Sequence, residues 1–84
     1  MQLLHYVPLM VTVYRGRGWK IAVYGREHGI PHCHIEAAGY RCSIGIETQD
    51  VIIGSAPSDV LKEAQDWARA NRALLLAKWQ ELNE

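Results

Sequence analysis

The sequence has few of the features that stabilise or target specialised small proteins. Two cysteines in 84 residues cannot form a disulfide framework. Both fall in segments with strand character, so we expect buried free thiols in a reducing compartment. No segment approaches the roughly 20 apolar residues of a membrane span, and the first residues lack the basic start of a signal peptide. These absences predict a cytoplasmic protein without a membrane partner.

Net charge is also absent, since nine basic residues balance nine acidic ones. The overall electrostatic footprint of a nucleic-acid-binding protein is therefore missing. The balance is locally uneven, because Arg15, Arg17, Lys20 and Arg26 follow one another with no acidic residue among them. Such a cluster is either a small basic patch that could contact RNA or a solvated turn and strand edge.

The length of 84 residues predicts a single domain that spans residues 1–84. A chain of this size buries only about 60% of the surface that its unfolded form exposes. A partner protein or a second copy in a homo-oligomer could supply the missing burial. Repeats, low-complexity tracts and linkers are absent.

Residues 9–54 predict an antiparallel sheet, because β-branched and aromatic residues alternate there between turn signals. The first hairpin joins residues 9–14 to residues 19–24 through a Gly-rich loop. We predict the register that pairs Val11 with Ile21, because it sets apolar residues opposite one another.

A second hairpin, with a turn at residues 38–39, joins a strand over 32–37 to a strand over 40–47. The predicted cross-strand pairs are Ala37 with Tyr40, Glu36 with Arg41, Ile35 with Cys42, His34 with Ser43, Cys33 with Ile44 and His32 with Gly45. One face then holds the apolar residues Cys33, Ile35, Cys42, Ile44 and Ile46, and the other holds His32, His34, Glu36, Arg41, Ser43 and Glu47. A short fifth strand follows at residues 51–53.

Residues 56–83 predict helix, because apolar residues recur there at helical spacing. Ser55 or Ser58 could cap the helix start. Asn71 is a poor helix former on the apolar stripe, so it predicts a bend or a second helix. The fold class is therefore α+β: an antiparallel sheet of four to five strands followed by a C-terminal amphipathic helix, or by two helices broken near Asn71.

The chemistry concentrates around His32 and His34, which point the same way because they lie two residues apart on one strand. With Arg41 to stabilise phosphate charge, these histidines could act as a catalytic acid–base pair on RNA. With His28 as a third nitrogen, they could instead ligate a divalent metal. No other cofactor is expected.

Further candidate site residues are Glu27, Glu36 and Ser43. The carboxylates could ligate a metal or orient a histidine, and Ser43 could contact a phosphate or hydroxyl group. A structural role for the histidines, or a binding surface without catalysis, remains open beside these readings.

One series of motifs resembles the DUF4160 family, a small prokaryotic family of unknown function. That family has the pattern E-H-x-P-P-H-x-H-V, a hairpin ending in I-E-T and a helix ending in L-L-x-x-W. The sequence matches at Glu27, His28, Pro31, His32 and His34, at Ile46-Glu47-Thr48, and at Leu74-Leu75 with Trp79. It departs at Ile30, where the family has a first proline. The resemblance starts near Pro8, so residues 1–7 are expected to be an N-terminal extension.

The resemblance implies a bacterial toxin-like component of a type II toxin–antitoxin pair. Such a protein would be held inactive by a small antitoxin-like partner encoded beside it, and would be RNase-like or would block translation. The alternatives are a metal-binding module built on the histidines and a non-catalytic protein–protein adaptor.

Overall fold

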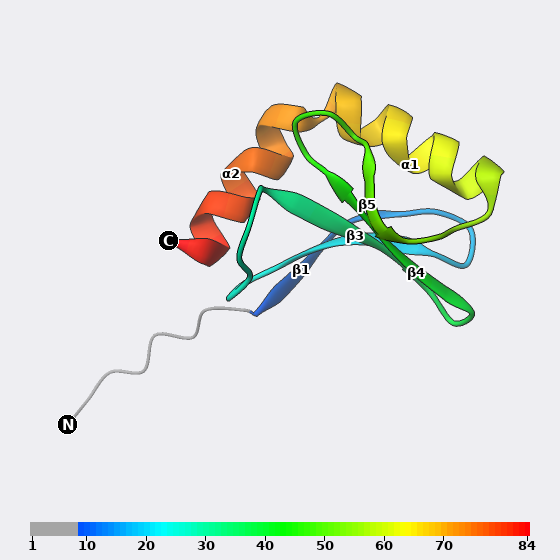
Figure 1. The fold of residues 1–84 in the computed structure, drawn as a ribbon, viewed down its shortest axis with the longest axis horizontal. Coiled ribbons are helices and arrows are strands. Elements are labelled where there is room, and N and C mark those ends of the chain that lie inside the picture. The colour runs from blue at the N-terminus through cyan, green and yellow to red at the C-terminus, as the bar shows by residue number, and fades with distance from the viewer. Residues whose placement is uncertain (1–8) are drawn as a thin grey trace.

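The structure is a computed structural model that describes residues 9–84. Its elements are β1 (Met10–Arg15), β2 (Lys20–Tyr24), β3 (His32–Ala37), β4 (Tyr40–Gly45), β5 (Val51–Gly54), α1 (Ser58–Ala70) and α2 (Arg72–Asn83). The strands form one antiparallel sheet in the order β1-β2-β3-β4-β5 (Figure 1). The predicted α+β class, with five strands and two helices, is confirmed. The predicted extension at residues 1–7 lies outside the described part.

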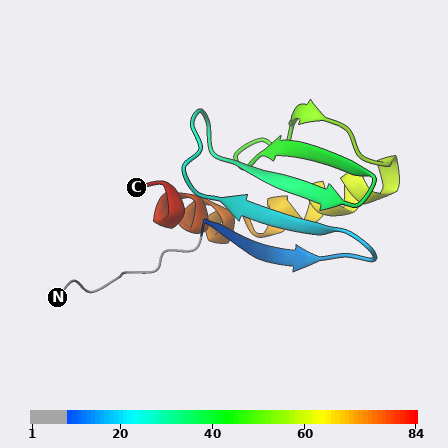
Figure 2. The ribbon, with the colours of Figure 1, turned by 90° about the horizontal axis from the view of Figure 1, so that it is seen from below.

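Both helices cover the same face of the sheet, and Figure 2 shows the strands in front of them. The core between the two layers consists of Trp19, Ile21, Val23, Cys33, Ile35, Cys42, Ile44, Ile46, Ala64, Ala68, Leu75 and Trp79. The opposite surface of the sheet is called the outer face below. Alternation along β3 assigns its odd-numbered residues to the core and its even-numbered residues to the outer face.

The predicted register of the second hairpin is confirmed at all six pairs, from His32 opposite Gly45 to Ala37 opposite Tyr40. The chain reverses at residues 38–39, as predicted. Apolar residues meet on one face and polar residues on the other only in this register. A shift by one residue would move every side chain of a strand to the wrong face.

The predicted register of the first hairpin is wrong. Val11 pairs with Val23 rather than with Ile21, because β1 continues to Arg15, which pairs with Lys20, and the connecting loop is therefore shorter than predicted. The register also shifts at Val13, between Thr12 and Tyr14. This bulge turns both Val13 and Tyr14 toward the core. The Tyr14 side chain thereby reaches α1, where its hydroxyl donates a hydrogen bond to Glu63 at 2.6 Å.

The helical segment breaks at Asn71, as the sequence indicates, and α1 and α2 flank that residue. Its backbone N–H caps α1 by donating to the carbonyls of Trp67 and Ala68. The predicted serine caps are wrong, since Pro57 occupies the N-cap position of α1 and makes no side-chain cap. The fixed φ of proline suits this position without any capping bond. Within residues 9–84, no helix is long and apolar enough to cross a membrane.

The last strand, β5, forms an edge of the sheet, and all four of its residues are exposed. Ile53 is 70% exposed and Ile52 is 48% exposed. The strand stops at Gly54, whose φ of +81° favours glycine. A Cβ at this position would also collide with the carbonyl oxygen of Arg41.

Both cysteines are buried as free thiols in the core. Burial raises the pKa of Cys33 from 9.0 to about 12, with a smaller contribution from neighbouring Cys42. The thiolate of Cys33 is therefore disfavoured in the folded protein, which makes the side chain an inert packing group.

The raised pKa of Cys33 links stability to alkaline pH. Between pH 9.0 and about 12 the unfolded chain loses this proton while the folded chain keeps it, so stability falls by up to about 1.4 kcal/mol per pH unit. We expect the stability difference between the protein and Cys33→Ala, measured by urea unfolding with reductant, to shrink from about pH 8 to about pH 10.5. A non-titrating core change, Ile44→Val, should cost the same at both pH values. A constant Cys33→Ala difference would contradict the burial of this thiol.

Candidate functional site

The loop of residues 25–31, between β2 and β3, carries Glu27 over the outer face. Arg26 adopts a left-handed conformation with φ of 60°, which is uncommon for a residue with a Cβ and turns the chain sharply. The backbone N–H of Glu27 then donates to Asn83 Oδ1 at 2.8 Å. Both features fix where the Glu27 side chain starts.

Asn83 is the last residue of α2 and connects that helix to the sheet. Its side-chain amide donates to the carbonyl oxygens of Tyr24 at 2.9 Å and Trp79 at 3.0 Å. With the bond from Glu27, one side chain ties β2, the loop and α2 together. The end of α2 therefore determines the position of the loop.

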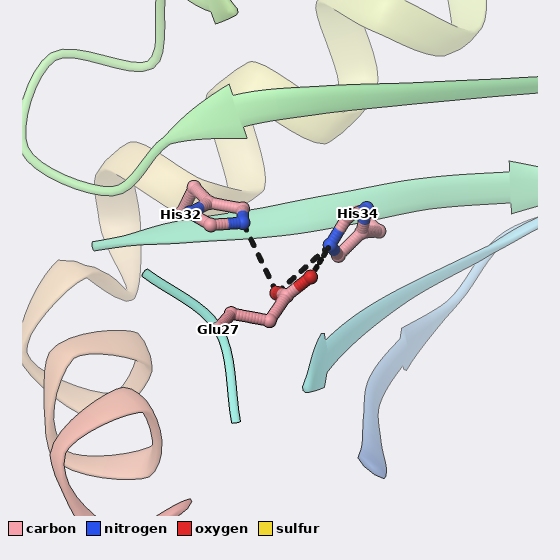
Figure 3. A group of neighbouring side chains, drawn as sticks. All are labelled: Glu27, His32 and His34. Atoms are coloured by element: carbon pink, nitrogen blue, oxygen red, sulfur yellow. Dashed lines mark hydrogen bonds and ion pairs between the residues drawn. The ribbon is translucent and has the colours of Figure 1, made fainter. Parts of the chain in front are cut away.

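Three side chains converge on the outer face at the start of β3 (Figure 3). Glu27 Oε1 lies 3.0 Å from His32 Nε2 and 3.0 Å from His34 Nε2, and Glu27 Oε2 lies 3.2 Å from His34 Nε2. We call Glu27, His32 and His34 the triad. One ligand atom from each lies within 4.8 Å of the others. All three side chains are mostly covered, with exposures of 27%, 14% and 11%.

Hydrogen bonding to the backbone locates one proton of the His32 ring. His32 Nδ1 lies 2.9 Å from the carbonyl oxygen of Ile30. A carbonyl oxygen only accepts hydrogen bonds, so Nδ1 carries a proton. In a neutral imidazole, Nε2 then presents a lone pair, and here it faces a carboxylate oxygen. Either a second proton or a metal cation must separate these two lone pairs.

Aromatic rings enclose the two histidines. The Tyr24 ring meets the His34 ring edge-on at 4.9 Å, and the Trp79 ring lies 4.8 Å from that of His32. Burial, followed by the hydrogen bond to Glu36, raises the pKa of Tyr24 above 10.0. The expected outer-face position of His34 holds, yet the residue is only 9% exposed because its neighbours cover it.

The other predicted site residues lie further along the outer face. Arg41 Nε is 2.9 Å from Glu36 Oε2, and Tyr24 donates to the same carboxylate at 2.8 Å. Ser43 is buried directly opposite His34. Together with His34 and Arg41 it lines a small cavity of about 250 Å³. Because Arg41 pairs with Glu36, the positive charge of Arg41 is partly neutralised.

The structure does not bring His28 into the triad. His28 is exposed on the loop, and its predicted place as a third metal ligand is occupied by Glu27. Three contributors were not named as site residues from sequence: Tyr24, Trp79 and Asn83. Helical spacing predicts the core position of Trp79, but it carries no signal that its ring reaches a histidine.

The fold and site define a small α+β protein with an acid–histidine cluster on its sheet. The family described as Domain of unknown function (DUF4160) matches residues 18–80. The chain belongs to that family. Neither a curated protein nor a solved structure matches this chain. The family description assigns no activity, so the site itself must carry any functional argument.

The position of Glu27 depends on Asn83, and this dependence can be measured. Replacing Asn83 with Ala removes three hydrogen bonds, so we expect a loss of about 1–3 kcal/mol in the free energy of unfolding. We also expect faster hydrogen exchange at the Glu27 amide. Gln80→Ala, an exposed change in the same helix, should alter neither. If the Glu27 amide exchanges hydrogen at the same rate in Asn83→Ala, the loop keeps its conformation without Asn83.

Proposed function

We propose that the chain binds a divalent transition-metal ion, zinc by preference, through Glu27, His32 and His34. The observation that carries the proposal is the pairing of His32 Nε2 with Glu27 Oε1 at 3.0 Å while His32 Nδ1 bonds to a backbone carbonyl. Histidine ligands of metals have this arrangement, with one nitrogen on the ion and the other N–H on a carbonyl or carboxylate.

The distances fit such an ion closely. In a tetrahedral zinc site with bonds of about 2.0–2.1 Å, neighbouring ligand atoms lie about 3.3 Å apart. Glu27 Oε1 lies 3.0 Å from each histidine nitrogen, so small side-chain rotations suffice to admit the ion. Two imidazoles and one carboxylate also suit zinc better than magnesium, which prefers oxygen ligands.

Metal binding explains the triad better than acid–base catalysis by the two histidines alone. Acid–base cleavage of a phosphodiester needs the base at the attacking oxygen and the acid at the leaving oxygen, on opposite sides of the phosphorus. The ligand atoms of His32 and His34 lie within 4.8 Å of each other, and both face the same carboxylate oxygen. Glu27 therefore occupies the space that a phosphate would need.

Three protein ligands are also the number found in catalytic zinc sites, where the fourth position belongs to water. A zinc ion held by these residues would supply Lewis-acid chemistry and could activate water. The triad would supply the ligands, the backbone carbonyl of Ile30 would hold the His32 ring, and Trp79 and Tyr24 would limit access of solvent.

Metal titration of chelator-treated protein tests the proposal. We expect one zinc ion per chain by isothermal titration calorimetry, with an increase in thermal stability, because a ligand at 100 times its Kd adds about 2.7 kcal/mol. Glu27→Gln should weaken zinc binding by about ten- to hundredfold or more, and His32→Ala and His34→Ala by at least as much. Binding should weaken because Glu27→Gln removes the negative charge of one ligand, and each His→Ala change removes a nitrogen donor.

His28→Ala is the matched control, since it deletes a neighbouring exposed histidine that lies outside the triad. Its zinc affinity should equal that of the unaltered protein. Equal weakening in His28→Ala and His32→Ala would indicate adventitious binding to surface histidines. The absence of zinc binding to the folded protein would exclude the metal site.

We also propose that this chain is the toxin-like component of a two-protein pair that acts in the cytoplasm. The observation that favours a partner is β5, an edge strand whose four residues are all exposed. Exposed apolar edge strands pair readily with added strands. The small antitoxin-like protein implied by the family resemblance would add a strand there.

Expression in bacteria tests the toxin role. We expect the chain alone to slow growth, and co-expression of the protein encoded beside it to restore growth. Glu27→Gln, which keeps the size of the side chain, should abolish the growth defect if the triad is the active site. Ile53→Asp should keep the defect but lose the rescue, because it places a charge on the exposed edge. If the unaltered chain is harmless alone, the toxin role is wrong.

A further inference from the structure

Four charged side chains form a row across the outer face of the sheet. Arg15 is directly opposite Lys20, Lys20 opposite Glu36, and Glu36 opposite Arg41. Directly opposite residues of antiparallel strands project from the same face. The row therefore crosses β1 to β4 and contains three cations and one anion. We call it the charge row.

The single anion of the charge row is already engaged. Glu36 pairs with Arg41 at 2.9 Å and accepts the Tyr24 hydroxyl hydrogen bond at 2.8 Å. Among the described residues, Arg15 and Lys20 lie in no ion pair within 4.0 Å. Two like charges opposite one another destabilise a sheet. An anionic ligand would remove that cost, which makes the pair a candidate binding feature.

The charge row lines a shallow groove of about 740 Å³ at the end of the sheet where the two hairpin turns lie. Trp19, Tyr24 and Tyr40 contribute aromatic surface to the same groove. The Tyr24 ring already lies under the Arg41 guanidinium, 5.4 Å from its carbon. Tyr24 lies on the same face of the sheet as the charge row, whereas Tyr40 lies opposite Ala37 beside the hairpin turn and packs against the core.

The spacing of the cations selects a polymer rather than a single anion. Neighbouring strands lie about 4.8 Å apart, so the charge row extends over about 14 Å. One small anion could contact only one end of it, whereas a chain with regularly repeated charges can contact all three cations. Nucleic acid single strands combine repeated phosphates with flat bases that stack on aromatic rings.

Two other polyanionic partners fit less well. An anionic membrane would need apolar residues beside the cations. Within residues 9–84 the exposed large apolar residues are Leu9, Ile30, Val51, Ile52, Ile53 and Leu74, and none of them lines the groove. An acidic peptide would meet the cations but would leave the Tyr24 ring without a planar partner.

We propose that the groove over β1 to β4 binds the backbone of single-stranded nucleic acid, with Arg15, Lys20 and Arg41 contacting phosphates and Tyr24 contacting a base. This binding requires no metal in the triad. The two sites are neighbours, because Tyr24 contacts both Arg41 and His34.

Fluorescence anisotropy with labelled oligouridylate and oligothymidylate, in the presence of a chelator, tests the proposal. For three phosphate contacts we expect log Kd to change with log salt with a slope of about 2, since each contact on a single strand contributes about 0.7. Arg15→Ala and Lys20→Gln should each weaken binding several-fold at low salt and lower that slope by about 0.7. Binding of either oligonucleotide with this pattern supports the groove, and the comparison of the two identifies the preferred sugar.

Arg17→Ala is the matched control, because Arg17 carries the same charge as Arg15 and lies two residues further on, in the turn after β1, but does not line the groove. Its affinity should stay within about twofold of the unaltered protein. The Glu27→Gln variant should also bind the oligonucleotides with unchanged affinity. This result would separate failure of the nucleic-acid groove from failure of the metal site. The proposal is overturned if neither oligonucleotide binds at low salt, if Arg17→Ala weakens binding as much as Arg15→Ala, or if polyglutamate competes equally well.

Discussion

The pairing of β3 with β4 is the constraint on which the remaining structure depends. Strand alternation in this register sends Cys33 and Ile35 into the core and His32 and His34 to the outer face. The core residues pack against the helices, and the histidines pair with Glu27. A slip of one residue would bury two imidazoles under α1 and α2 and expose the apolar residues, so packing and chemistry are fixed by the same hydrogen-bond ladder.

The C-terminal end of α2 holds the triad in place. Trp79 packs in the core and also contacts His32, while Asn83 holds both Tyr24 and the Glu27 loop. The cluster is therefore supported by side chains from a helix far away in sequence. Support of this kind limits the rotation of catalytic or ligating side chains, which must keep their geometry when a ligand arrives.

The sequence predicts the structure correctly where apolar and polar residues alternate consistently on both paired strands. The second hairpin is correct at every pair because apolar and polar residues alternate on both strands. The predicted register of the first hairpin is wrong because β1 continues to Arg15 and leaves a shorter loop than the one predicted from Tyr14 onward. A bulge at Val13 then interrupts the alternation along β1. Glu27 rather than His28 joins the histidines because the left-handed turn at Arg26 and the distant Asn83 orient the loop. Contacts between residues 56 positions apart have no local signature.

Gly54 has a consequence for how far the sheet can grow. No side chain fits there, because a Cβ would collide with the backbone of β4, and the chain leaves the sheet at this residue. The exposed edge is consequently only four residues long. A strand that joins it meets few free amides and carbonyls, so backbone pairing alone would hold it weakly. Recognition at this edge must then depend on the side chains of the incoming strand.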